Sequence, residues 1–332
     1  MSVEKTGILL VQLGGPTKRE ELKGFLYRLF ADPEVLGIPF APLRKAIAWT
    51  IATTRAPESA KTYEKIGWSP IRCWTEKSAM LLEAELGPSW PGAPPIVRSA
   101  MTCSDPLVED VLPQLRAAGV TRLFVLPLYP QYSVTTTKGS FARVDESLAK
   151  MGWSPARVNA PDAWYSEPRF LDAHVARIEE AAALLPDPDP AATVLLYSAH
   201  SLPVSTIEKR KDPYPKQIEA TCALIDERLG RRFRSRLGYQ SKLGPIAWLG
   251  PSTNEILANL AREGAKQVLV CPVAFVSDHV ETLYEIRMLF ADEARALGIP
   301  TYAAVDGLND HQAFIGALAD ISRKALLGQG DR

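Results

Sequence analysis

The strongest constraint on the fold is a regular alternation of short β-rich runs with longer helix-like stretches along the chain. The clearest β-rich runs cover residues 7–13, 95–100, 122–128, 193–198, 246–249 and 267–273. Strands that alternate with helices form parallel sheets with helices on both faces. We therefore predict an α/β fold.

Two pairs of segments resemble each other and indicate an internal repeat. Residues 117–133 align without a gap with residues 262–278. A weaker similarity joins LLVQLGGP to LLYSAHSLP and places Leu13 opposite His200. We predict two similar doubly wound halves. The first comprises residues 1–145 and 304–332 and includes segment 37–55, and the second comprises residues 146–303 and includes His200 and Glu281.

Composition excludes several classes of protein. Lys plus Arg and Asp plus Glu both number 38, so no net charge attracts nucleic acid. The apolar run near the N-terminus is too short for a signal peptide or a membrane span, which predicts a cytoplasmic protein. The 4 cysteines include no CxxC pair, which predicts reduced structural thiols rather than a metal or iron–sulfur site.

Polar motifs follow several predicted strands: QLGGP, YPQYSVTTTKGS, SAHSLP and FVSDHVETLYE. In open α/β sheets, ligands bind outside the carboxyl ends of the strands, so we expect these loops to converge in a cleft between the halves. QLGGP lacks the GxGxxG fingerprint and the Lys-Ser/Thr of a phosphate loop. A tight turn from strand to helix is therefore favoured there over a nucleotide site.

The main candidates for chemistry are His200 and a run of carboxylates. His200 directly follows an apolar strand, a position that suits a structural histidine or a functional one. Asp278, Glu281 and Glu285 lie at spacings that a helix would place on one face. Such a face is often merely solvated, but apolar flanks and mutual repulsion favour raised proton affinity here. Imidazole with carboxylates suits a divalent metal that is bound briefly, as a substrate.

Segment 37–55 combines large apolar residues with Arg44, Lys45 and Arg55 after a proline-marked start. This basic amphipathic pattern has two interpretations. It is either an ordinary helix packed on the core, or an apolar lip over a hydrophobic ligand with peripheral membrane contact.

Taken together, the motifs resemble those of the ferrochelatase family. The matching stretches are LVQLGGP, RLFADPEV, YEKIGWSPI, LPLYPQYSVTTT, SAHSLP with DPYP, YQSKLGPIAWLGPST and PVAFVSDHVETLYE, in the family's order from about residue 7 to about residue 310. The resemblance implies two flavodoxin-like halves of the class II chelatase type. It also implies insertion of ferrous iron into a porphyrin, with iron as substrate and no permanently bound cofactor.

The resemblance further implies the roles of individual residues. His200 would be the active-site histidine, as base or metal ligand, and Glu281 its acidic partner. Asp278 and Glu285 would join them as proton relay or metal path. The implied porphyrin-binding residues are Leu13, Arg55, Tyr63, Ser69, Trp248 and Phe275.

The chain departs from the family pattern in two places. Arg287 and Leu289 stand where many members continue the acidic series, which predicts a shortened or redirected acid path. Thr102 and Cys103 replace a common Arg-Tyr pair, which puts that part of the pocket in doubt. The cysteine extension that binds a two-iron cluster in some relatives is missing, so we predict no iron–sulfur cluster.

The apolar Leu13 and the apolar lip favour protoporphyrin IX over coproporphyrin III, because relatives that act on coproporphyrin carry a tyrosine in that loop. Coproporphyrin III remains an alternative substrate. A cobalt chelatase for a corrin precursor would want a more basic pocket, and a nucleotide-dependent enzyme would need a glycine fingerprint. A non-catalytic porphyrin or haem carrier is the remaining alternative.

Overall fold

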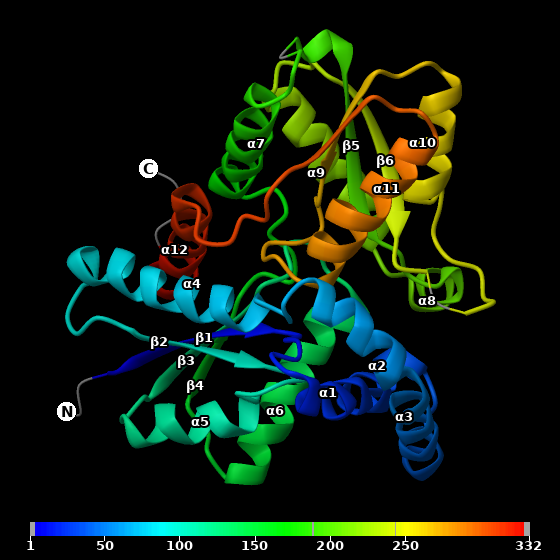
Figure 1. Ribbon diagram of the computed structural model, residues 1–332. Helices are drawn as coiled ribbons and strands as arrows, with labels where there is room; N and C mark the ends of the chain where they lie inside the picture. Colours follow the sequence, from blue (N-terminus) through cyan, green and yellow to red (C-terminus); the bar gives the residue numbers. More distant parts are fainter. Residues whose placement is uncertain (1–3, 188, 243, 329–332) are drawn as a thin grey trace. The chain divides into compact units, whose positions relative to one another are not determined.

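The computed structural model describes residues 4–187, 189–242 and 244–328. The chain forms two compact units, each built on a four-stranded parallel sheet (Figure 1). One unit comprises the chain up to Tyr129, Ser133–Asp162 and the chain from Ile315 onward, and the other comprises Pro130–Tyr132 and Ala163–Phe314. The predicted α/β class with two similar parallel-sheet halves is confirmed.

The first unit has the strand order β2-β1-β3-β4. Its strands are β1 (Thr6–Gln12), β2 (Ile96–Met101), β3 (Arg122–Pro127) and β4 (Ala156–Asn159). Its helices are α1 (Arg19–Ala31), α2 (Pro33–Leu36), α3 (Ala41–Lys65), α4 (Ile71–Leu86), η1 (Gly87–Ser89), α5 (Val108–Ala117), the π-helix η2 (Val134–Lys138), α6 (Gly139–Met151) and most of α12 (Gln312–Leu327). Leu9 and Val11 pack against α5 and α6, and the whole of β1 is buried.

The second unit has the matching order β6-β5-β7-β8. Its strands are β5 (Thr193–His200), β6 (Arg234–Gln240), β7 (Gln267–Cys271) and β8 (Thr301–Ala304). Its helices are α7 (Pro168–Ala183), η3 (Pro190–Ala192), α8 (Val204–Arg210), α9 (Tyr214–Arg228), α10 (Thr253–Arg262), the π-helix η4 (Glu281–Leu289) and α11 (Phe290–Ala296). Side chains of a strand alternate between the two faces of the sheet, so Val194 and Leu196 lie on the same face. Both pack against α10, η4 and α11.

One expected strand is wrong and three real strands were not anticipated. Residues 246–249 form no regular strand, and Trp248 makes only an isolated antiparallel bridge to Pro203. The strand next to β5 is β6, whose sequence RSRLGYQ is polar because it lies at the sheet edge. The edge strands β4 and β8 are short and incompletely buried, so they lack the apolar run that marks a central strand.

The unit boundaries differ from the expected residues 145 and 304. Helix α6 continues to Met151 and β4 pairs with β3, so the first unit extends to Asp162. After β8, the chain stays with the second unit, since the Val305 amide donates to Val270 and the Asp278 amide donates to the Asn309 side chain. Helix α12 returns to the first unit, where Arg323 contacts the end of α4.

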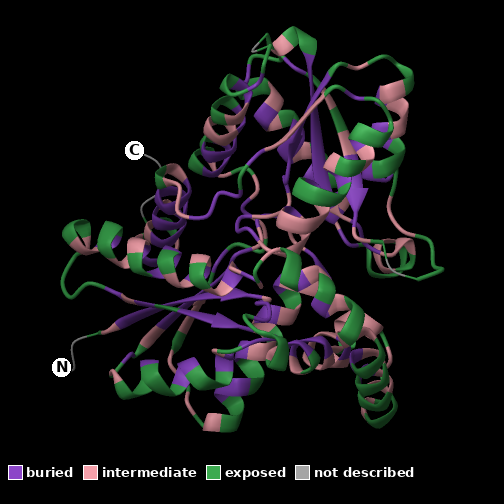
Figure 2. Ribbon diagram, in the orientation of Figure 1, coloured by how far each residue is buried: buried purple, intermediate pink, exposed green. Residues whose placement is uncertain are grey.

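Figure 2 shows the strands of both sheets as largely buried and much of α3 as exposed. The buried residues of α3 are Ala48, Ala52, Ala60 and Tyr63. Phe40, Leu43 and Trp49 are 65%, 50% and 57% exposed, so the amphipathic segment presents large apolar side chains to solvent. Among the described residues, no helix has the length and apolar character needed to cross a membrane.

Candidate active site at the end of strand β5

His200 is the last residue of β5, a strand that lies between β6 and β7. Its ring Nδ1 lies 2.8 Å from Glu281 Oε2, and its side chain remains 37% exposed. Its carbonyl oxygen accepts a hydrogen bond from the Tyr214 hydroxyl at 3.0 Å. The backbone and one ring nitrogen are therefore fixed, and the ring still reaches solvent.

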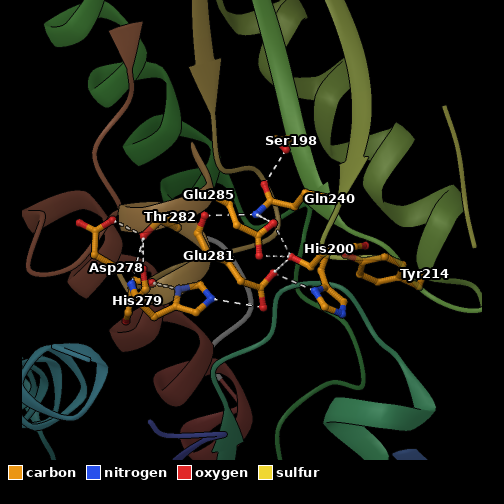
Figure 3. Close-up of polar contacts among 11 residues, drawn as sticks. Ser198, His200, Tyr214, Gln240, Asp278, His279, Glu281, Thr282 and Glu285 are labelled. Carbon is orange, nitrogen blue, oxygen red and sulfur yellow. Dashed lines mark hydrogen bonds and ion pairs between the residues drawn. The ribbon is translucent and has the colours of Figure 1, made fainter. Parts of the chain in front are cut away.

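Helix η4 brings Glu281 and Glu285 to the same side as His200 (Figure 3). It is a π-helix, in which the backbone N–H of residue i+5 donates a hydrogen bond to the carbonyl oxygen of residue i. The Phe290 amide, for example, donates to the Glu285 carbonyl oxygen. π-Helical turns occur frequently at functional sites. The predicted shared face of these two carboxylates agrees with the observed contacts.

Ser241 links the two carboxylates. Its hydroxyl oxygen lies 2.6 Å from Glu281 Oε2 and 2.9 Å from each carboxyl oxygen of Glu285. A hydroxyl has one proton and can donate to only one carboxylate, so the second short contact requires a proton on a carboxyl group. The geometry therefore favours one shared proton on the pair.

Gln240 supports this arrangement from the end of β6. Its side-chain carbonyl accepts from the Ser198 hydroxyl at 2.6 Å, and its amide donates to the Glu281 backbone oxygen at 3.2 Å. The Ser198 hydroxyl also lies 2.8 Å from the Thr253 hydroxyl at the start of α10. Buried polar groups that are hydrogen-bonded in this way hold the first turn of η4 against the sheet.

His279 lies on the other side of Glu281. Its Nδ1 lies 3.0 Å from the Ser277 carbonyl oxygen, which fixes a proton on that nitrogen, and its Nε2 lies 3.8 Å from Glu281 Oε1. The Phe275 ring packs against it with centroids 4.7 Å apart. Glu281 is thus placed between two imidazoles.

The pKa values of Glu281 and Glu285 are shifted in opposite directions. Burial opposes charge on His200, but the Glu281 carboxylate outweighs it and raises the pKa of His200. Burial also opposes charge on Glu281, yet the two imidazoles hold its pKa well below the usual value. Burial and the charge of Glu281 raise the pKa of Glu285 to about 7. The site therefore combines a hydrogen-bonded imidazole–carboxylate pair with a second carboxyl group whose pKa lies near neutrality.

Asp278 does not join this cluster. Its carboxylate accepts from the Thr282 hydroxyl at 2.7 Å and from the Asn309 amide at 2.7 Å. It precedes η4, so the expected three-residue face holds only for the two glutamates. In Figure 3 it lies apart from the His200–Glu281 pair, beside Thr282.

The other expected site residues are divided between the units. Leu13, Arg55, Tyr63 and Ser69 belong to the first unit, and Trp248 and Phe275 belong to the second. Tyr63 stacks on Trp68, and the Arg55 guanidinium lies 5.9 Å from the centre of the Phe30 ring.

QLGGP is a tightly packed turn, as expected. Gly14 has a φ of +85°, and a Cβ there would meet Ser104 Oγ at 2.1 Å. A Cβ on Gly15 would meet Ser69 Oγ at 2.5 Å, while the Gly15 amide donates to Ser104 Oγ at 3.1 Å. The glycines therefore allow close packing of neighbouring side chains.

The four residues that depart from the family pattern have the following surroundings. Arg287 pairs with Asp306, and Leu289 is 44% exposed. Cys103 is buried, which raises the pKa of its thiol to about 12, and the Thr102 hydroxyl contacts its sulfur. Within the described residues, no group of three or more His, Cys, Asp or Glu side chains is arranged to hold a metal ion.

Sequence reasoning missed Ser241, Gln240, His279 and Tyr214. Gln240 and Ser241 stand in YQSK, at the end of the strand that was not recognised. Recognising RSRLGYQ as an edge strand would have placed both residues at the carboxyl edge of the sheet, beside His200.

Comparisons with known proteins agree with this geometry. A model of the family described as Ferrochelatase matches residues 5–326. The ferrochelatase of Synechococcus sp. (strain JA-3-3Ab) is 40% identical over 330 residues, which cover 98% of this chain and 95% of that protein. The ferrochelatase of Gloeobacter violaceus is 38% identical over 320 residues, or 96% of each chain.

Solved structures show the same fold at low sequence identity. SirB from Bacillus subtilis with Fe3+ gives a TM-score of 0.59 at 11% identity and covers 98% of both chains. A cobalt complex of the sirohydrochlorin chelatase SirB from Bacillus subtilis subspecies spizizenii gives 0.52 at 14% identity, again over 98% of both chains. The fold is that of the class II chelatases. Together with the full-length sequence matches, it establishes that this chain belongs to the ferrochelatase family, lyases that insert metal into a porphyrin with ferrous iron as substrate.

Proposed function

We propose that this chain inserts ferrous iron into protoporphyrin IX to form protohaem, the terminal step of haem biosynthesis, with His200 as the base. The observation that carries the proposal is the 2.8 Å contact between His200 Nδ1 and Glu281 at the carboxyl end of β5. This edge of an open α/β sheet is where ligands bind.

The pair gives His200 the properties of a general base. Glu281 holds a proton on Nδ1 and so leaves Nε2 of the neutral ring to accept a pyrrole proton. The imidazolium that forms is stabilised by the same carboxylate, as the raised pKa of His200 indicates. Exposure of 37% of the side chain allows the ring to exchange protons with solvent between turnovers.

Glu281 and Glu285 supply the proton relay and the path for the entering iron. Carboxylate oxygens and imidazole nitrogens suit a divalent first-row metal that must later leave them for four porphyrin nitrogens. Asp278 is omitted from this path because Thr282 and Asn309 occupy its oxygens.

The test is anaerobic turnover of the purified protein with ferrous iron, comparing protoporphyrin IX with coproporphyrin III. We expect haem formation that favours protoporphyrin IX and is lost in His200→Ala. A preference for coproporphyrin III would overturn the substrate assignment alone. Tight porphyrin binding with no metal insertion would leave a carrier.

The porphyrin contacts are proposed from the family resemblance: Leu13, Arg55, Tyr63, Ser69, Trp248 and Phe275. Arg55 is assigned to a propionate because guanidinium groups pair with carboxylates. We expect Arg55→Ala to weaken binding of protoporphyrin IX more than binding of its dimethyl ester, measured by fluorescence quenching. Equal weakening would contradict the propionate assignment.

We also propose that the protein is cytoplasmic and makes peripheral contact with a membrane. The contact surface is the exposed apolar set Phe40, Leu43 and Trp49, with Lys45 exposed beside it. We expect Trp49→Ser to reduce cosedimentation with anionic phospholipid vesicles, and Met80→Ser, which removes an exposed apolar residue of α4, to leave it unchanged. Equal binding by all three proteins would contradict this contact.

We propose that no cofactor and no iron–sulfur cluster is permanently bound. The free cysteines are Cys73, Cys103, Cys222 and Cys271, of which only Cys73 is exposed. Anaerobic reconstitution with iron and sulfide, followed by visible spectroscopy, is expected to give no cluster absorption.

A further inference from the structure

Ser241 has a backbone conformation that is unusual for its residue type. Its φ is +65°, in the left-handed region that glycine and asparagine adopt more readily than other residues. The position directly follows β6, and Gln240 before it is buried and fixed by hydrogen bonds to Ser198 and to η4. The strained residue therefore stands on a rigid support.

Within the described part of the chain, the side-chain hydrogen bonds of Ser241 go to the two carboxyl groups. They join its hydroxyl to Glu281 Oε2 and to both carboxyl oxygens of Glu285. Glycine would suit the backbone better but would remove these contacts. Strain that persists at a ligand-handling site is a reason to look for a function of the side chain.

We propose that Ser241 is a positioning residue for metal insertion, whose hydroxyl holds Glu281 and Glu285 together so that the pair presents one preformed oxygen surface to the divalent metal. The inference rests on the proposed function. Two adjacent carboxylates repel each other, and Glu281 is also held by His200 at 2.8 Å. Without the hydroxyl, Glu285 keeps the longer hydrogen bond from the Gln240 side-chain amide, at 3.4 Å, while Glu281 stays on the imidazole at 2.8 Å, so the two carboxyl groups are no longer joined directly.

The informative variant is Ser241→Gly, because it removes the hydroxyl and relieves the left-handed backbone at the same time. We expect its thermal stability to be retained, its KM for ferrous iron to rise about tenfold, and its KM for porphyrin to stay within about twofold. Ser241→Asn restores N–H donors in a residue that tolerates this φ, and we expect it to recover part of the affinity for iron.

Arg231→Gly is the matched control. Arg231 also has a positive φ, of 53°, but it is exposed in the turn after α9, where its amide donates to the Asp226 carbonyl oxygen. We expect its kinetic constants to equal those of the wild type, so that any effect of Ser241→Gly is attributable to the lost hydroxyl.

A second measurement separates this inference from the proposed function. Binding of Co2+ to wild type and to Ser241→Gly is followed by its visible absorption, without porphyrin or turnover. Weaker Co2+ binding by the variant supports the positioning role even if the wild type prefers another porphyrin. A variant with unchanged Co2+ affinity and unchanged KM for iron would overturn the role of Ser241 while leaving the chelatase activity of the wild type intact.

Discussion

The two units share a topology but carry different side chains at equivalent positions. Each sheet places its first strand between the second and the third, and each has a π-helix after the third strand, η2 and η4. The gapless alignment of residues 117–133 with 262–278, continued through η2 into α6 and through η4, places Thr136 opposite Glu281 and Ser140 opposite Glu285. Leu13 stands opposite His200.

The difference shows that the fold supplies positions and the side chains supply chemistry. In the second unit, an imidazole and two carboxylates meet within hydrogen-bonding distance of one another or of Ser241. In the first unit, the opposite positions hold residues that do not titrate near neutral pH.

His200→Ala removes the proposed base, and Leu13→Ala changes the opposite position in the first unit. We expect His200→Ala to lower kcat by about 10²–10⁴, the usual contribution of a general base. Leu13→Ala should change kcat by less than about tenfold and act mainly on the KM for porphyrin. Anaerobic haem formation measures both, and a His200→Ala enzyme within tenfold of wild type would contradict the assignment.

Glu281→Gln keeps the shape of the side chain but removes the charge that stabilises imidazolium. We expect kcat to fall by about 10²-fold while porphyrin affinity, measured by fluorescence titration, stays unchanged. Thr136→Val at the opposite position should leave kcat near the wild-type value. Loss of porphyrin affinity in Glu281→Gln would instead indicate a binding role for this carboxylate.

Glu285 makes the stability of the fold depend on pH. Its pKa is about 7 in the folded protein, against a usual value of 4.5, so the folded state binds more protons than the unfolded state between these values. The free energy of unfolding therefore falls as pH rises from about 4.5 to about 7. Glu285→Gln should be more stable than wild type at pH 7.5 by about 1–3 kcal/mol, and the gain should vanish near pH 4.5.

Thermal unfolding at several pH values measures this difference between wild type and Glu285→Gln. Ser140→Ala is the control at the opposite position, and its stability difference from wild type should not vary with pH. A Glu285→Gln gain that is the same at pH 4.5 and 7.5 would show that the carboxyl group titrates normally.

Gly15→Ala tests the packing of QLGGP, the turn that corresponds to SAHSLP. The new Cβ would lie 2.5 Å from Ser69 Oγ, so we expect a loss of about 1–3 kcal/mol in the free energy of unfolding. Gly24→Ala in α1, whose nearest contact would be Arg28 Nη1 at 3.7 Å, should be neutral or stabilising. Equal melting temperatures for the two variants would contradict the packing argument.

The sequence was informative where a local pattern carried the signal. Apolar runs identified the central strands β1, β3, β5 and β7, because a strand buried on both faces has no polar side chains to interrupt it. The same reasoning failed for β6, β4 and β8, which lie at or next to sheet edges and mix polar with apolar residues. The missed strand β6 is the reason that Ser241 was missed.

The sequence alone determined the fold class, the repeat, the family resemblance, and the candidates His200 and Glu281. These features depend on local periodicity and on motif order, both of which are properties of the amino-acid sequence. Only the tertiary structure decided which acids meet the imidazole. The π-helical turn and the contacts of Asn309 bring Glu285 to Ser241 and take Asp278 away, and such contacts join residues far apart in sequence. Spacing fixes a face of a helix, but the partners of that face are set by packing.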